Sequence, residues 1–554
     1  MNKFWKDKTF VFFLILLIIA LGIRIIGVNQ AFFDDEIDYV ITTKISTFYG
    51  LNNIVLHPPL VTWVNMFFGL FTTSLLIYRF VPLILGLLTI FFVYLISRKL
   101  YDEKSAIFAS AIMAFSFYHV LASLQVGDEG GFLAFLYTFA FYCYLNHENG
   151  KKHWYYLSAI AAGLALLAKE SSILLLGILF IYELTNKNKF VSFENIKRTV
   201  IKTLPLAIIA FLIFSIYPLL NLLSPIDYTE GVKNTVSSYF SFGFNLQGPG
   251  LLLLWATPFL IFLTLISLLK IQKEDRLFLI WIGASLISYL FFINLGDHSR
   301  YFMNVIPAMA ILSGRFLSKI KFTKKNVILF ILIFLIFFIV LGIYNTGNFR
   351  YIPRDLNTYL NELKNFRGDG LFSYTTSSGP LFLVSIASII ISYFWAFFFF
   401  ILSSLWIKRK LIAFGKISFI ILLGITFAFN IFVLQEYLFH GFHANPSQVI
   451  KEMVKEPYQL PVYSDNTAIL FYLNEKYLED QGRKGGNWYY TGVYGEYIDR
   501  DNIKKVVKER GGTIFLLNYP ILPENSPILE LVKECKLKKS FTSKNIELGQ
   551  IYVC

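Results

Sequence analysis

The stretch Thr9–Val28, TFVFFLILLIIALGIRIIGV, decides the class of fold. Its length and apolar composition are those of a helix that crosses a bilayer, which needs about 20 consecutive apolar residues. A cleaved signal peptide is the rival interpretation, but the run is long enough to span and lacks a convincing small-x-small cleavage site. Lys3, Lys6 and Lys8 precede the run, so the positive-inside rule places the N-terminus in the cytoplasm. We expect Arg24, near the outer end, to snorkel or to face a polar cavity.

The composition of the whole chain supports the same class. The 554 residues are 56% hydrophobic and 16% charged, whereas soluble domains are about 45–50% apolar and about 25% charged. A net charge of +14 would indicate a nucleic-acid partner in a soluble protein. Here lysine and arginine lie mostly between apolar runs, as the positive-inside rule requires. The sequence therefore predicts a multi-pass protein of the cell membrane, with no nucleic-acid partner.

Apolar runs and basic loops alternate along the chain and predict its topology. The basic loops include Arg98-Lys99, Lys151-Lys152 and Lys408-Arg409-Lys410, which all fall on the cytoplasmic side. Length and charge together give about thirteen transmembrane helices. The run Leu60–Leu76 is an exception, because counting it as a crossing would put Arg98-Lys99 outside. We expect it to form an interfacial helix on the outer leaflet.

The composition changes beyond about Ala444, where charged residues become dense. The predicted strands and helices of this part are Pro461–Tyr463 and Thr513–Leu517 as strands and Asn502–Arg510 and Pro527–Glu534 as helices, with Gly511-Gly512 ending the first helix. The predicted fold is an α-helical polytopic membrane protein with a small extracytoplasmic α/β domain. The transmembrane domain covers residues 1–444 and the α/β domain covers residues 445–554.

The three cysteines are too few for a disulfide framework. Cys143 lies in an apolar run, where packing is the expected role. Cys535 and Cys554 both lie in the predicted extracytoplasmic domain, and the sequence leaves open whether they pair.

An acidic cluster, Phe33-Asp34-Asp35-Glu36-Ile37-Asp38-Tyr39, follows the first predicted span. Carboxylates at a helix N-terminus offset the helix dipole, but that role explains one or two acids and not four. Ionisable groups near a bilayer are costly and indicate function. A carboxylate can act as a general base toward a hydroxyl, and neighbouring acids can hold a divalent cation.

Further polar residues are expected at the same outer face. His57-Pro58-Pro59 precedes the Leu60 helix, where the prolines fix an extended approach. A lone histidine is more often structural, and the sequence leaves open whether His57 belongs to a site. Asp128-Glu129 lies at the next outer junction, either as a polar turn or as a second acidic wall or set of metal ligands.

Basic residues are scarce on the predicted outer side, and Arg79, Lys169 and Arg300 are the candidates there. A departing phosphate needs cationic stabilisation as its charge develops. Snorkelling anchors are the alternative for each residue, and for Lys169 a salt-bridged tight turn with Glu170 is a further one.

The order of these motifs resembles the GT-C membrane glycosyltransferases, in the branch of protein O-mannosyltransferases and aminoarabinose-lipid A transferases. The resemblance covers about residues 1–175 and the region around residue 300. Its motifs are Asp35-Glu36-x-x-Tyr39, His57-Pro58-Pro59-Leu60, Arg79-x-x-Pro82-x-x-x-Gly86-x-Leu88, the acid near Asp128, Lys169 after Leu164-Ala165-Leu166-Leu167, and Arg300-Tyr301 with Pro307.

This resemblance implies an inverting glycosyltransferase. It would move a sugar from a polyprenyl-phosphate donor to a hydroxyl acceptor on a protein, lipid or glycan at the outer membrane face. The resemblance implies Asp35 as the base, and the additional Asp34 leaves the choice open among Asp34, Asp35 and Glu36. Some members of the family hold a divalent metal ion near an acidic or histidine group. The candidate ligands here are His57, Asp128 and Glu129, and the candidate substrate-binding residues are Tyr39, Arg79, Lys169, Arg300 and Tyr301.

Two other functions compete with transfer. A polyprenyl-lipid transporter or flippase would use the same acids to bind a headgroup, but it predicts functional charges at mid-membrane depth and on both faces. The sequence concentrates them at the outer face, which favours an enzyme. An inactive scaffold with a partner-binding C-terminal domain is the third alternative.

Overall fold

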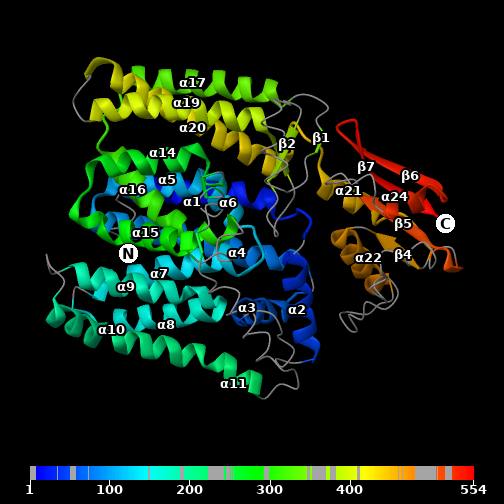
Figure 1. Cartoon of the computed structure of the whole chain (residues 1–554), viewed down its shortest axis with the longest axis horizontal. Helices are drawn as coiled ribbons and strands as arrows, with labels where there is room; N and C mark the ends of the chain where they lie inside the picture. Colours follow the sequence, from blue (N-terminus) through cyan, green and yellow to red (C-terminus); the bar gives the residue numbers. More distant parts are fainter. Residues whose placement is uncertain are drawn as a thin grey trace. The chain divides into compact units, whose positions relative to one another are not determined.

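The computed structural model describes residues 8–33, 35–49, 58–72, 74–147, 150–186, 192–222, 243–244, 250, 252–253, 255–291, 299–345, 350–351, 370–374, 382–407, 412–459, 461–464, 466–480, 507, 509–517 and 527–554. Contacts group the chain into two compact units (Figure 1). The helical unit comprises Met1–Val28, Tyr49–Phe338 and Ser392–Leu434. The mixed unit comprises Asn29–Phe48, Ile339–Ile391 and Gln435–Cys554. The domain boundary at 444/445 stays a prediction.

In its described residues, the helical unit consists of helices. They are α1 (Lys8–Gly27), α3 (Leu60–Gly69), α4 (Ile77–Leu100), α5 (Glu103–Phe115), α6 (Phe117–Ala122), η2 (Asp128–Leu133), α7 (Ala134–His147), α8 (Lys152–Ala168), η3 (Glu170–Ser172), α9 (Ile173–Asn186), α10 (Phe193–Phe214), α11 (Ile216–Leu222), α14 (Thr257–Ser267), η4 (Leu268–Lys270), η5 (Lys273–Asp275), α15 (Arg276–Phe291), η7 (Ser299–Val305) and α16 (Ile306–Ser318). Three further helices continue from one unit into the other: α17 (Lys324–Tyr344), α19 (Ile386–Ile407) and α20 (Ile412–Phe439).

Within the described residues, six helices are long and apolar enough to cross a membrane. They are Lys8–Gly27, Ile77–Leu100, Phe193–Leu219, Lys324–Tyr344, Ile386–Ile407 and Gly415–Phe439. The predicted helical, polytopic class is confirmed, and the first predicted span is α1. The total of about thirteen spans stays a prediction. Helix α3 has 10 residues, which is too short to cross a bilayer, and its placement on the outer leaflet also stays a prediction.

Arg24 does not snorkel. Its guanidinium is buried and donates to the carbonyl oxygens of Ala20 at 2.9 Å, Ala114 at 3.3 Å and Met113 at 3.4 Å. It also bonds Nδ1 of His119 at 2.8 Å. The last carbonyls of a helix lack partners within the helix, and α5 ends here at an extended Ser116. Arg24 therefore satisfies the carbonyls that the break between α5 and α6 leaves open.

We expect Arg24→Met to lower the free energy of unfolding by about 2 kcal/mol or more, because each buried carbonyl that loses its donor costs about 1–3 kcal/mol. Thermal unfolding of the purified protein in detergent measures this effect. Ile25→Leu is the control, since Ile25 is on the same helix but 49% exposed. A melting temperature that does not change in the Arg24 variant would contradict the assignment.

In its described residues, the mixed unit contains two sheets and four helices besides the ends of α17, α19 and α20. The helices are α2 (Asp35–Tyr49), α21 (Pro446–Met453), α22 (Thr467–Asp480) and α24 (Pro527–Val532). A three-stranded sheet has the order β1 (Arg350–Tyr351), β2 (Gly370–Tyr374), β3 (Phe382–Ser385), with β1–β2 parallel and β2–β3 antiparallel. A four-stranded sheet has the order β4-β5-β7-β6, from β4 (Val462–Ser464), β5 (Thr513–Leu517), β6 (Lys536–Ser543) and β7 (Ile546–Val553). The predicted small C-terminal sheet is therefore present.

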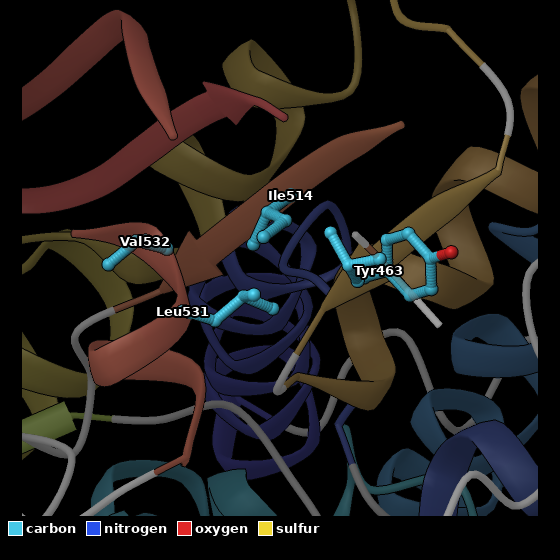
Figure 2. Packing of buried hydrophobic residues seen from close by; sticks show 5 residues of the cluster. Tyr463, Ile514, Leu531 and Val532 are labelled. Atoms are coloured by element: carbon cyan, nitrogen blue, oxygen red, sulfur yellow. The ribbon is translucent and has the colours of Figure 1, made fainter. Parts of the chain in front are cut away.

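The four-stranded sheet is built around β5, which is buried along its whole length. It pairs with β4 in parallel and with β7 antiparallel. A core cluster gathers between these strands and α24 (Figure 2), formed by Tyr463, Val507, Ile514, Leu531 and Val532. A disulfide joins Cys535 to Cys554 and fastens the start of β6 to the end of the chain.

The predicted elements of this part correspond closely to the observed ones. The predicted strands are β4, shifted by one residue, and β5, and the helix predicted from Pro527 is α24. The helix predicted over Asn502–Arg510 lies mostly outside the described residues. Gly511 has φ +63° and its N–H donates to the Val507 carbonyl at 2.8 Å, which is the helix-ending role predicted for glycine.

Candidate functional site

Two predicted acids and two predicted cations converge in the helical unit. Lys169 Nζ lies 3.2 Å from Asp128 Oδ2 and also pairs with Glu129 Oε1. Arg300 Nε lies 3.3 Å from the same Glu129 oxygen. All four residues are buried, with Asp128, Glu129 and Lys169 at 1–2% exposure and Arg300 at 8%. We name these four residues the charge cluster.

Glycines and a helix break position the charge cluster. Asp128 and Glu129 open a single π-helical turn, η2, a form often found at functional sites. A Cβ added to Gly130 would lie 2.6 Å from the Ala122 carbonyl oxygen, and one added to Gly131 would lie 2.7 Å from that of Pro82. Only glycine therefore lets η2 pack this closely on α4 and α6. Lys169 directly follows α8 and has an extended backbone, so the helix ends just before it.

The surroundings shift the pKa values of the two acids in opposite directions. Burial, followed by the neighbouring Glu129, raises the pKa of Asp128 well above its usual range. Burial would also raise the pKa of Glu129, but Arg300 and Lys169 outweigh it and hold that pKa well below its usual range. Asp128 is therefore favoured as the neutral acid and Glu129 as the carboxylate. The charge cluster therefore holds two cations around the Glu129 carboxylate.

Tyrosines border the charge cluster. Lys169 Nζ lies 4.5 Å from the ring centroid of Tyr301, and the Arg300 guanidinium carbon lies 5.6 Å from the same centroid. These are cation–π distances. The Tyr301 carbonyl accepts a hydrogen bond from the Tyr289 hydroxyl at 2.6 Å. Sequence reasoning missed Tyr289, because 33 tyrosines are spread through the chain and no local motif marks this one.

Arg79 is buried rather than snorkelling. Its Nη1 donates to the Leu124 carbonyl at 2.5 Å, in the segment that leads into η2. Through this hydrogen bond, Arg79 holds the backbone of the segment just before Asp128 in place.

The acidic cluster near the start of the chain lies in the mixed unit. Asp35, Glu36 and Asp38 occupy the first turn of α2, while Asp34 lies outside the described residues. Glu36 is buried, and its Oε2 accepts from the Phe33 N–H at 3.4 Å. Asp35 is half-buried and Asp38 is exposed. Glu36 therefore has a local structural partner, and Asp35 combines access to solvent with partial burial.

The remaining predicted site residues are Tyr39 and His57. Tyr39 is half-buried on α2, where its carbonyl accepts from the Thr43 hydroxyl at 2.8 Å. His57 lies outside the described residues. The structure therefore brings Asp128, Glu129, Lys169, Arg300 and Tyr301 together, and it places Asp35, Glu36 and Tyr39 on one helix of the other unit.

A divalent metal ion was among the expectations for Asp128, Glu129 and His57. Within the described part of the chain, no three His, Cys, Asp or Glu side chains converge to hold a metal ion. Asp128 and Glu129 instead pair with Lys169 and Arg300. These two carboxylates do not form a metal site by themselves, and the metal ion stays a prediction.

Known proteins match the chain in two ways. A family model described as dolichyl-phosphate-mannose-protein mannosyltransferase matches residues 56–217, a range that includes three of the four charge-cluster residues. No curated protein sequence matches the chain significantly. The crystal structure of ArnT from Cupriavidus metallidurans bound to undecaprenyl phosphate is similar, with a TM-score of 0.58 at 14% identity, covering 98% of this chain and 97% of that one.

The apo crystal structure of the same ArnT is also similar, with a TM-score of 0.54, 14% identity and the same coverage of both chains. At this identity the likeness concerns the fold, and it extends over nearly the full length of both chains. Together with the six long apolar helices of the described residues, it confirms the helical, multi-pass class of fold that the sequence predicted. The chain is a multi-pass membrane protein that shares the fold of ArnT from Cupriavidus metallidurans.

Proposed function

We propose that this protein is an inverting glycosyltransferase that moves a sugar from a polyprenyl-phosphate donor to a hydroxyl acceptor at the outer face of the membrane. The observation that carries the proposal is the buried charge cluster, in which two cations pair with Glu129. A polyprenyl phosphate is an anionic leaving group on a lipid chain. Such a group needs fixed cations at the edge of an apolar, helical structure.

In this proposal Lys169 and Arg300 bind the donor phosphate, and Tyr301 lies beside both cations. Glu129 fixes the two cations before the substrate arrives, so no reorganisation is needed as charge develops. Neutral Asp128 adds no repulsion toward the phosphate. Arg79 acts through Leu124 and holds the segment that leads to η2.

Asp35 is the proposed base. It takes the proton of the acceptor hydroxyl while the hydroxyl oxygen attacks the anomeric carbon from the face opposite the phosphate. The bond from the anomeric carbon to the phosphate oxygen breaks, and polyprenyl phosphate leaves with the electron pair. The donor would come from the bilayer among about thirteen membrane spans, and the acceptor, on a protein, lipid or glycan, from outside.

The proposed orientation has the N-terminus in the cytoplasm and the C-terminal part outside. The Cys535–Cys554 disulfide supports it, because disulfides persist in oxidising compartments and are rare in the cytosol.

We expect Cys535→Ser to leave a thiol at the exposed Cys554 that reacts with a membrane-impermeant maleimide in intact cells. Labelling followed by gel-shift analysis measures it. The double variant Cys535→Ser/Cys554→Ser is the control, since its remaining Cys143 is buried. Labelling that occurs only after the cells are lysed would place the C-terminal part inside.

To test this function, the purified protein in lipid is incubated with a panel of radiolabelled polyprenyl-phosphate sugars. Peptide, lipid and glycan acceptors are added to each reaction. Transfer of label to one acceptor class identifies donor and acceptor at once. A transporter or flippase would instead move the intact labelled lipid across the bilayer and transfer nothing. That outcome, found across the whole panel, would overturn the proposal.

A further inference from the structure

The acidic helix α2 belongs by its contacts to the same unit as the C-terminal segment Gln435–Cys554. The two parts are far apart in sequence, yet the Lys44 side chain on α2 donates a hydrogen bond to Glu475 on α22. We propose that α22 positions the proposed catalytic base, with Tyr472 and Glu475 as the positioning residues. This inference rests on the function proposed above.

The first fastening lies just before α2. The backbone N–H of Phe32 donates to the Tyr472 hydroxyl at 3.0 Å. The Phe32 ring stacks on Tyr472, with centroids 6.5 Å apart and planes within 7°, and meets Phe471 edge-on at 6.2 Å. Ala31 N–H donates to the Ser447 hydroxyl at 3.1 Å. The chain that leads to Asp35 is therefore held by both backbone and ring contacts.

The second fastening lies farther along α2. Lys44 Nζ is 2.5 Å from Glu475 Oε2, and the two side chains are 15% and 20% exposed. Tyr472 and Glu475 are three residues apart on α22, a spacing that puts them on one face of a helix. Lys44 and Phe32 lie on either side of Asp35 in the sequence. One face of α22 therefore holds the chain both before and after the proposed base.

This arrangement has a consequence for catalysis. A general base must lie within hydrogen-bond reach of the proton that it removes, and a misplacement of about 1 Å can cost about 100-fold in rate. The Lys44–Glu475 pair keeps 15% and 20% exposure, so its loss should cost less stability than the loss of a fully buried pair. If α22 acts as a positioning element, weakening its two contacts lowers kcat while the fold remains intact. If the contacts serve only to dock two segments, kcat and stability change together.

The experiment uses the full chain in lipid nanodiscs and the variants Tyr472→Phe and Glu475→Gln. Tyr472→Phe keeps the stacked ring and removes only the hydroxyl, and Glu475→Gln keeps the shape and removes the charge. Tyr477→Phe, on the same helix and 41% exposed, and Glu547→Gln, exposed on β7, are the matched controls. Three quantities are measured: kcat and KM for the donor lipid, the melting temperature, and amide hydrogen exchange of residues 32–44.

We expect kcat to fall by about 10- to 100-fold in Tyr472→Phe and Glu475→Gln, with KM and melting temperature unchanged. Exchange across residues 32–44 should rise in these variants and not in the controls. The charge swap Lys44→Glu with Glu475→Lys should restore part of kcat and lower the exchange again. Exchange that stays at the wild-type level, unchanged kcat in an active enzyme, or kcat that falls only in step with melting temperature, would each overturn the inference.

Hydrogen exchange separates this inference from the proposed function. If the wild type transfers no sugar from any donor while exchange of residues 32–44 still responds to the variants, the function fails and the fastening of α2 by α22 stands. If the wild type transfers sugar while exchange and kcat of the variants match it, the function stands and the positioning role fails.

Discussion

Replacing Asp35 with asparagine should lower the rate of sugar transfer by about 10²- to 10⁴-fold, the range expected when a general base is lost. Asparagine has nearly the same shape as aspartate but cannot accept a proton at neutral pH. Donor binding should change little, since Asp35 is proposed to act on the acceptor hydroxyl. The measurement is kcat and KM for the donor lipid, with correct insertion checked by the melting temperature.

Asp38→Asn is the matched control for this prediction. Asp38 is on the same first turn of α2 but is exposed, so its loss should leave the rate within a few-fold of wild type. Full activity in Asp35→Asn would move the base to Asp34 or Glu36. Glu36 is the weaker of these two candidates, because it is buried and accepts from the Phe33 N–H.

Replacing Lys169 with methionine should lower transfer by about 10²- to 10³-fold, the typical effect of removing one group that stabilises developing negative charge. Methionine has a similar length, but it removes the cation that pairs with both acids of the charge cluster. Removing one partner of a buried ion pair can also lower the free energy of unfolding by about 3–5 kcal/mol. The single variant therefore needs a partner variant that separates catalysis from folding.

The double variant Lys169→Met/Glu129→Gln supplies that separation. It removes one positive and one negative charge, so the formal charge of the cluster does not change. We expect the double variant to recover melting temperature relative to the single variant while sugar transfer remains low. Transfer at the wild-type rate in the double variant would show that Lys169 is a structural counter-ion and not a phosphate ligand.

The membrane class and the residues of the charge cluster were predictable from sequence for physical reasons. A run such as Thr9–Val28 must form a helix in lipid, because every backbone polar group there needs an internal partner. Basic residues were expected to be scarce outside, which singled out Lys169 and Arg300. The pairing of these two cations with Glu129 was not predictable. Lys169 and Glu129 are 40 residues apart, and no local spacing encodes their contact.

Other features had no local signal. At the break between α5 and α6, Arg24 donates hydrogen bonds to carbonyls that are 89 and 90 residues away in the sequence. The hairpin of β6 and β7 turns at Lys544 and Asn545, both with positive φ, and this pair lacks the glycine that marks tight hairpins. The contact between Phe32 and Tyr472 joins residues 440 apart. Long-range contacts of this kind follow from the folded arrangement and not from periodicity.

The most direct test of the account is the stoichiometry of the reaction in lipid vesicles. We predict that one molecule of free polyprenyl phosphate appears for each sugar that reaches an acceptor, and that Asp35→Asn and Lys169→Met both suppress the two products together. Equal loss of both products would link the base and the charge cluster to a single bond-breaking step. Labelled donor that crosses the bilayer intact, with no polyprenyl phosphate released, would contradict the account.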